Sequence, residues 1–304
     1  MNAPTPPRTV AEYLEQLRAA LTGADAALIQ DALYDAEEHL RGELRDSRDK
    51  PEAEVLAKIA ASYGAPGEVA EIYVDKENVV RQALRPPPPP PRKTALGRFF
   101  AVGADPRAYS ALFYMLLSLA TGIFYFTWTV TGLSLSLGLS ILIFGIVVAV
   151  LFFGTTRVLS LVEGRIVEVM LGERMPRRPL YPPREGSMFK RIGGMFRDPR
   201  TWSTLLYFVL MLPLGIAYFT FAVTGIALSL SFILAPLAHV GWMLGIVRID
   251  WATDIQFNDT LTVPWQLADP LLFVLGVVLL FGLLHLARGI GRFQGGLAKA
   301  LLVN

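Results

Sequence analysis

The residue types that usually carry chemistry are scarce in this chain of 304 residues. It contains no cysteine, which excludes a disulfide framework, a thiolate nucleophile and a cysteine-ligated metal site. Its three histidines, His39, His239 and His285, are far apart in the sequence and have no visible triad or metal-ligand partners. We therefore expect no enzymatic activity, no catalytic residue, no metal site and no cofactor.

Two matching aromatic segments are the first candidates for a binding site. The tripeptide Tyr-Phe-Thr occurs at 125–127 and again at 218–220, in strongly apolar sequence. Aromatic rings gather at membrane–water interfaces, so an aromatic belt explains both segments. The alternative is a shallow outward-facing pocket for a lipid or another amphiphile. Its predicted lining residues are Tyr125, Thr127, Tyr218 and Thr220.

His239 is a further candidate, because an ionisable side chain within an apolar stretch is often functional. It lies near Trp242, and the two residues together predict a ligand site with proton or metal sensing as the specific hypothesis. His285 lies close to the basic residue Arg288, so snorkelling or a local hydrogen bond explains it.

The composition places these residues in a membrane protein. The chain is 53% hydrophobic and 18% charged, whereas soluble domains are usually about 45–50% apolar and about 25% charged. Residues 1–85 carry a net charge of −6, and residues 86–304 carry +8. An ordinary soluble enzyme is thus excluded, and an acidic soluble domain attached to a basic membrane domain is predicted.

Residues 10–85 are predicted to form a small cytoplasmic helical domain after a disordered lead over 1–9. Apolar residues recur there at spacings of three and four, as in Val10, Leu14 and Leu17, which is typical of amphipathic helices. The candidate partner-binding residues of this domain are Tyr34, Glu37, Glu38 and Tyr63.

Six consecutive prolines, 86–91, begin a linker that we place at 86–104. A proline run adopts the extended polyproline II conformation, so we expect a semi-rigid spacer between the helical domain and the membrane.

Four segments are long and apolar enough to cross a membrane, namely 108–131, 137–157, 202–224 and 270–287. Gly132 and Gly225 are expected to end the first and third helices, because glycine favours the left-handed conformation at a helix end. A further apolar segment, 226–247, contains a proline and either spans or re-enters the membrane. We expect it to be re-entrant or interfacial, as an extension of the third span.

An internal repeat relates the first and third spans. At an offset of 93 positions, 105–137 and 198–230 agree at 19 of 33 residues. The tails align at an offset of 131, for example Arg157 with Arg288 and Gly164 with Gly295. The sequence therefore predicts an all-α fold with a duplicated four-span membrane domain over 105–304. Its two copies are 105–175 and 198–304, with an extracytoplasmic insert near 231–269.

The charges orient these spans. Seventeen Lys and Arg residues lie in 92–107, 157–200 and 288–304. The charged residues of 248–269, in contrast, are one arginine, Arg248, and four aspartates. The excess of positive charge on cytoplasmic loops predicts four spans in a bacterial inner membrane, with both termini cytoplasmic.

Residues 12–73 resemble the HAAS signalling domain, a small helical module of bacterial membrane proteins. The similarity rests on Tyr-Leu-Glu-Gln-Leu at 13–17, Tyr-Asp-Ala-Glu-Glu-His at 34–39 and Tyr-Gly-Ala-Pro-Gly-Glu-Val-Ala at 63–70. Because such modules are often paired with PadR-type transcription regulators, the resemblance implies a regulator of this type as partner.

Residues 105–302 are similar to the sensor membrane domain that precedes the kinase core in many bacterial histidine kinases. The shared motifs are Leu-x-Tyr at 112–114 and 205–207, and Gly-Ile-x-Tyr-Phe-Thr at 122–127 and 215–220. No kinase core follows in this chain, so the signal is expected to leave through residues 1–85 or a separate kinase.

These observations favour a sensor or regulatory protein without catalytic activity. We expect it to relay an envelope or membrane signal to a cytoplasmic regulator through its N-terminal helices. Membrane lipids are expected contacts, direct nucleic-acid binding is not expected, and a homodimer is left open. The alternative is an accessory or scaffold subunit of a transporter or envelope enzyme complex.

Overall fold

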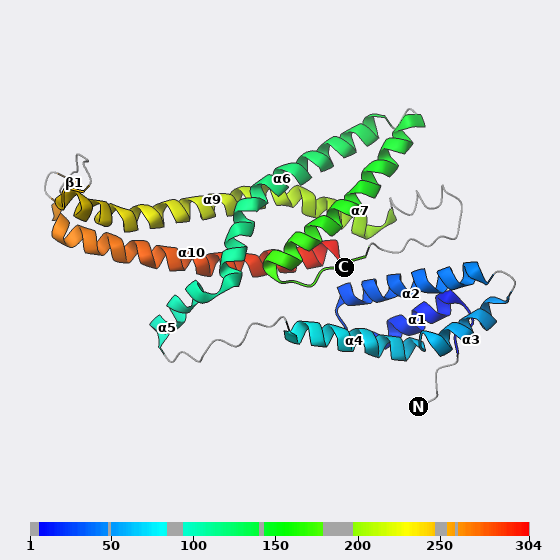
Figure 1. Ribbon diagram of the computed structural model, residues 1–304. Helices are drawn as coiled ribbons and strands as arrows, with labels where there is room; N and C mark the ends of the chain where they lie inside the picture. Colours follow the sequence, from blue (N-terminus) through cyan, green and yellow to red (C-terminus); the bar gives the residue numbers. More distant parts are fainter. Residues whose placement is uncertain are drawn as a thin grey trace.

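The computed structural model describes residues 6–47, 50–83, 94–139, 143–178, 197–246, 254–258 and 261–303. Over these residues the fold is all-α, apart from one two-stranded hairpin (Figure 1). The predicted proline run lies outside the described residues.

Four helices form the N-terminal region, which spans 6–83. They are α1 (Val10–Ala20), α2 (Ala26–Asp46), α3 (Glu52–Ser62) and α4 (Pro66–Ala83). Their apolar faces enclose one core, in which Tyr13 and Leu17 are fully buried. The hydroxyl of Tyr13 donates to the carbonyl of Gly64 at 2.8 Å, and the positive φ of +114° at Gly64 turns the chain from α3 into α4. The predicted amphipathic helices are therefore confirmed.

Among the described residues, four longer helices are long and apolar enough to cross a membrane, which is the architecture of a multi-pass membrane protein. They are α6 (Pro106–Gly138), α7 (Ile143–Leu171), α9 (Pro199–Met243) and α10 (Trp265–Leu302). In Figure 1, α9 and α10 run side by side as one hairpin, and α6 and α7 form a second one that crosses it. Asp105 and Asp198 cap α6 and α9, because each carboxylate accepts the N–H two residues ahead.

The helices extend further than the sequence predicted. Gly132 and Gly225 do not end α6 and α9, and neither has a positive φ. Their missing side chains instead admit Phe152 and Leu283 from the neighbouring helices. The segment over 226–243 is a continuous part of α9, as expected of an extension of the third span, and its re-entrant or interfacial placement stays a prediction. Beyond the predicted second and fourth spans, residues 158–171 and 288–302 likewise continue α7 and α10 without a break.

Two smaller features complete the fold. The strands β1 (Asp254–Asn258) and β2 (Leu261–Pro264) pair antiparallel at the far end of the α9–α10 hairpin (Figure 1). The short helices α5 (Ala95–Phe100) and η1 (Ala101–Ala104) precede α6. Both pack on α10, where the ring of His285 lies 3.0 Å from the carbonyl of Phe99.

Candidate functional site

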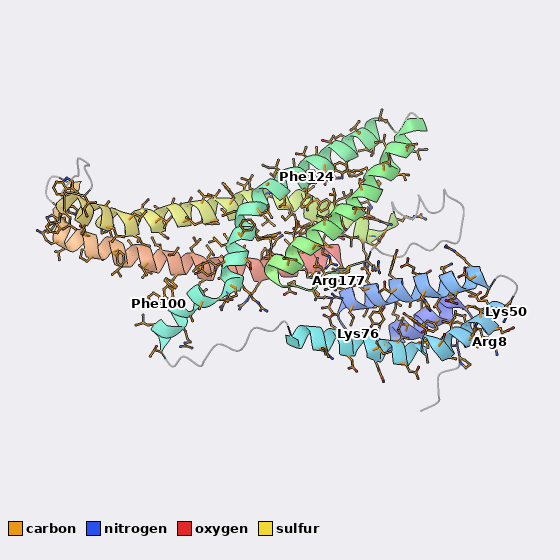
Figure 2. The ribbon with its side chains drawn as sticks, viewed as in Figure 1. Arg8, Lys50, Lys76, Phe100, Phe124 and Arg177 are labelled. Carbon is orange, nitrogen blue, oxygen red and sulfur yellow. The ribbon has the colours of Figure 1, made fainter. Side chains whose placement is uncertain are left out.

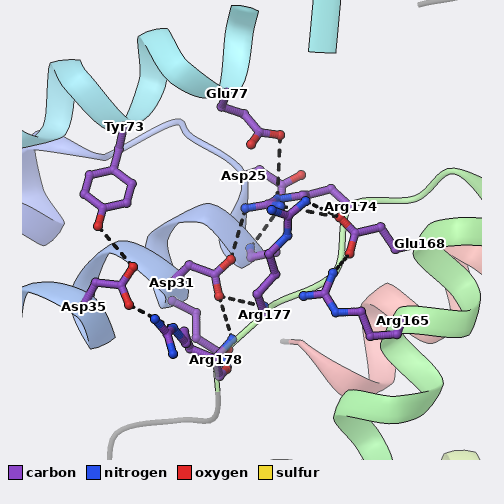
Figure 3. Close-up of polar contacts among 12 residues, drawn as sticks. Asp25, Asp31, Asp35, Tyr73, Glu77, Arg165, Glu168, Arg174, Arg177 and Arg178 are labelled. Carbon is purple, nitrogen blue, oxygen red and sulfur yellow. Dashed lines mark hydrogen bonds and ion pairs between the residues drawn. The ribbon is translucent and has the colours of Figure 1, made fainter. Parts of the chain in front are cut away.

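A network of ion pairs joins the N-terminal region to the membrane helices (Figure 3). Its centre is Asp31 of α2, whose side chain is nearly buried. One carboxylate oxygen accepts from the guanidinium of Arg174 at 3.0 Å. The other accepts the backbone N–H groups of Arg177 and Arg178 at 2.7 and 2.9 Å. Burial raises the pKa of Asp31 above its usual range, and these three donors oppose the shift. Asp31 thus holds the segment that follows α7.

Further pairs surround Asp31 and complete what we call the docking interface. Arg178 pairs with Asp35 at 2.9 Å, Arg174 lies 3.6 Å from Glu77 of α4, and Lys299 of α10 pairs with Asp25. Figure 2 places the labelled Arg177 of this segment beside α2. Gln30 donates to the carbonyl of Arg178 at 2.7 Å and accepts from Arg200 at 3.4 Å. The docking interface comprises Asp25, Gln30, Asp31, Asp35, Glu77, Arg174, Arg177, Arg178, Arg200 and Lys299.

A second polar cluster lies where the membrane helices cross. Glu163 of α7 is fully buried, and its carboxylate accepts three phenol hydroxyls. They belong to Tyr114 at 2.9 Å, Tyr125 at 3.0 Å and Tyr207 at 2.8 Å. A carboxylate has two oxygens that can each accept more than one hydrogen bond, so three hydroxyl donors match its capacity. The three donors come from α6 and α9, so one side chain joins three helices.

Gln294 extends this cluster to α10. Its amide donates to the hydroxyl of Tyr207 at 3.0 Å, and its carbonyl accepts from Tyr218 at 3.1 Å. Tyr207 therefore donates to Glu163 while it accepts from Gln294. We call Tyr114, Tyr125, Glu163, Tyr207, Tyr218 and Gln294 the polar centre. Every membrane helix contributes to it, so a relative movement of any of them must alter its hydrogen bonds.

Residues separated by 93 or 131 positions make matching contacts. Asp105 pairs with Arg288 at 3.2 Å, and Asp198 pairs with Arg157 at 3.1 Å. At the crossing of α6 and α9, the space at Gly122 is bounded by the backbone of Met211, and the space at Gly215 by the backbone of Ser118. Within the polar centre, Glu163 and Gln294 are likewise 131 positions apart.

The model of the family described as "Putative sensor" matches residues 114–302, which is more than half of the chain. The chain belongs to this sensor family. The matched region, hereafter the sensor domain, contains the whole polar centre. No curated protein and no solved structure matches the chain. The family match does not reach residues 12–73, so the resemblance of that segment to the HAAS domain stays a prediction.

The sensor domain separates the residues of the predicted amphiphile pocket. Tyr125 and Tyr218 are buried in the polar centre, whereas Thr127 and Thr220 are exposed. Thr220 donates to the carbonyl of Ile216 on its own helix. The two tyrosines do not lie near the ends of their helices, because α6 and α9 continue well beyond them.

His239 and Trp242 do lie together, near the β1–β2 end of the sensor domain. His239 is buried, and its Nδ1 lies 2.6 Å from a carboxylate oxygen of Asp269 at the start of α10. Its ring centroid is 5.8 Å from that of Trp242 and 5.1 Å from that of Trp265. The predicted pair is thus part of a larger cluster that joins α9 to α10.

The predicted partner-binding residues divide between three environments. The guanidinium carbon of Arg178 lies over the ring of Tyr34, 5.5 Å from the ring centroid. With Glu37, which pairs with Arg41, Tyr34 lines an open groove of about 760 Å³ beside the sensor domain. Tyr63 stacks on His39 at 4.4 Å. Glu38 is exposed.

The sequence reasoning missed Glu163 and Gln294, since both lie beyond the predicted spans 137–157 and 270–287. A usable signal was present, because the offset of 131 aligns these two residues and the offset of 93 aligns Tyr114 with Tyr207. Asp31 carried no such signal, as it is one of sixteen acidic residues in 1–85.

Proposed function

We propose that this protein is a non-enzymatic sensor of the bacterial inner membrane that controls a cytoplasmic regulator through its N-terminal helices. The observation that carries the proposal is the docking interface, in which Asp31 holds the segment after α7 by three hydrogen bonds. Any displacement of the end of α7 acts directly on these bonds, and a displacement of the end of α10 acts on the ion pair of Lys299 with Asp25. The N-terminal region is thereby poised to respond to the state of the sensor domain.

The surface that would be released lies on α2. Tyr34 and Asp35 contact Arg178 in the docked arrangement, so a regulator that binds them competes with the sensor domain. The HAAS-like motifs favour a PadR-type transcription regulator as this partner, and a separate kinase is the second choice. The surplus of basic residues at the docked end supports a cytoplasmic location for both termini.

We further propose that the sensor domain arose by duplication. The matched ion pairs of Asp105 and Asp198, and the matched glycines at the crossing of α6 and α9, support this origin. A duplicated domain has two hairpins that can rotate against each other about the polar centre. Such a rotation would carry a change at the membrane to the ends of α7 and α10.

Crosslinked capture from native membranes tests the proposal. The baits are the wild-type chain, a chain without residues 1–83, Asp31→Arg, and the control Asp46→Arg, whose exposed site lies on the same helix. We expect the wild type and the control to capture a soluble regulator equally, Asp31→Arg to capture more, and the truncated chain none. A transporter or envelope enzyme that the truncated chain still captures would contradict the proposal and favour a scaffold subunit.

A further inference from the structure

A small cavity lies beside the docking interface, between α7, the first turn of α9 and Gln30 of α2. Its volume is about 50 Å³, which exceeds the roughly 10–15 Å³ that a single ordered water needs. Four hydroxyl side chains and two arginines line it: Thr156, Ser160, Thr201, Thr204, Arg157 and Arg200. We call it the hydroxyl cavity.

Thr201 is the clearest sign that the cavity takes a polar ligand. The residue is only 4% exposed, and its Oγ1 has no hydrogen-bond partner among the residues that the structure describes. A buried hydroxyl without a partner costs about 1–3 kcal/mol. Thr156 and Ser160 differ, because they donate to the carbonyls of Phe152 and Arg157. Thr201 therefore has a hydrogen-bond donor available for a ligand.

The charge of the cavity selects an anion. Both oxygens of Asp198 are engaged, one by the guanidinium of Arg157 and the other by the backbone N–H of Arg200. The guanidinium of Arg200 has no carboxylate partner within the described part of the chain, and its bond to Gln30 is long, at 3.4 Å. The N-terminus of the 45-residue helix α9 adds positive potential at the same place.

The matching location in the other half of the membrane-helix bundle shows that the fold does not require this cavity. Offsets of 93 and 131 positions replace the four hydroxyl residues by Ala108, Ala111, Ala287 and Gly291. All four are buried in close packing, and the Cβ of Ala111 occupies the space beside Gly291. At these four positions, hydroxyl groups are therefore specific to the half of the bundle that meets α2.

We propose that the hydroxyl cavity binds a phosphate group. A phosphate offers several acceptor oxygens to the hydroxyls of Thr201 and Thr204 and to the guanidinium of Arg200, and arginine suits this geometry. The group comes either from the headgroup of an anionic lipid or from a soluble phosphate. Because Gln30 and Arg200 belong to the docking interface, a bound phosphate would alter docking, a consequence that rests on the proposed function. The binding of phosphate itself does not rest on the proposed function.

Unfolding of the purified full-length chain in a phosphate-free detergent tests the binding. The probes are inorganic phosphate, short-chain phosphatidic acid, and diacylglycerol of the same chain length as an uncharged control. A ligand that binds the folded state raises the unfolding midpoint with its concentration, which yields a dissociation constant without any partner protein. The variants are Arg200→Gln combined with Thr201→Ala, and the control Arg107→Gln, which changes the exposed matching arginine.

We expect a phosphate-bearing probe, but not diacylglycerol, to stabilise the wild type and Arg107→Gln alike. The double variant should bind that probe roughly tenfold or more weakly, because a charge-assisted hydrogen bond and a hydroxyl donor are lost. A response to phosphatidic acid alone supports a lipid as the source, and a response to both probes supports a soluble phosphate. No response to either probe, or equal responses from the double variant and the wild type, would overturn the proposal. Either negative result would leave the proposed relay to a regulator standing, because no regulator is present in this assay.

Discussion

The carboxylate of Glu163 is the point at which the membrane helices are tied together. A charged side chain in an apolar bundle is costly unless its hydrogen-bonding capacity is satisfied. Here three phenol hydroxyls from α6 and α9 satisfy it, and Gln294 links the same cluster to α10. The polar centre therefore fixes one arrangement of four helices whose remaining contacts are mostly apolar.

Replacement of Glu163 should destabilise the fold in a graded way. Glu163→Leu leaves three buried hydroxyls without their acceptor, at about 1–3 kcal/mol each, so the unfolding midpoint should fall by several degrees. Glu163→Gln retains one acceptor oxygen, as Gln294 does at the matching position. Its unfolding midpoint should therefore fall less than that of Glu163→Leu. Thermal unfolding of both variants in detergent checks this order. Equal midpoints for Glu163→Leu and the wild type would show that the cluster contributes nothing to stability.

Asp31 gives the fold a dependence on pH. Burial raises its folded-state pKa above the ordinary carboxyl value of about 3.9. At a pH between the pKa of Asp31 in the unfolded chain and its higher pKa in the folded protein, the folded protein binds more protons at this site than the unfolded chain does. The stability from Asp31 is therefore complete below pH 4 or so and is lost as the pH rises through the folded pKa.

Asp31→Asn isolates this effect, because it cannot titrate. The unfolding midpoint of the wild type, measured relative to that of Asp31→Asn, should decrease as the pH rises through this window and become constant above it. A relative midpoint that is constant throughout, or that increases with pH, would contradict the assigned shift. Other acidic groups titrate in both proteins and cancel in the comparison.

At the scale of elements, the close crossing of α6 and α9 depends on glycine. A Cβ at Gly122 would overlap the backbone of Met211, which cannot move aside as a flexible side chain can. Gly122→Ala should therefore lower the free energy of unfolding by about 1–3 kcal/mol or more. Gly154→Ala is the matched control, since nothing lies within 4 Å of its Cβ. It should be neutral or stabilising, because alanine favours a helix by about 1 kcal/mol.

Chemical denaturation of both glycine variants in detergent decides between these expectations. If Gly122→Ala proved as stable as Gly154→Ala, the helices would not approach each other as described.

The existence of these elements could be predicted more readily than their ends. Apolar segments long enough to cross a membrane identified all four long helices. Their ends were placed too early at Gly132 and Gly225, because a glycine that ends a helix and a glycine that admits Phe152 or Leu283 look identical in sequence. The caps at Asp105 and Asp198 were predictable, since Asp-Pro-Arg satisfies the helix start locally.

At the scale of the whole molecule, an acidic N-terminal region meets the basic end of a membrane bundle. The opposite charges of the two halves were evident in the sequence, but the contact was not, because Asp31 and Arg174 are 143 positions apart. The proline run suggested a spacer that separates the halves. No local pattern reveals that the chain folds back so that α2 lies against the segment after α7.

Docking of the N-terminal region is the central claim, and a distance measurement tests it most directly. Because the chain has no native cysteine, spin labels attach selectively to two introduced cysteines, Glu43→Cys and Ala300→Cys. Both positions are exposed, the first on α2 and the second on α10. We predict one narrow distance distribution that Asp46→Arg leaves unchanged. Asp31→Arg should lengthen and broaden it, while circular dichroism shows unchanged helix content. A long, broad distribution in the wild type that Asp31→Arg does not alter would contradict docking.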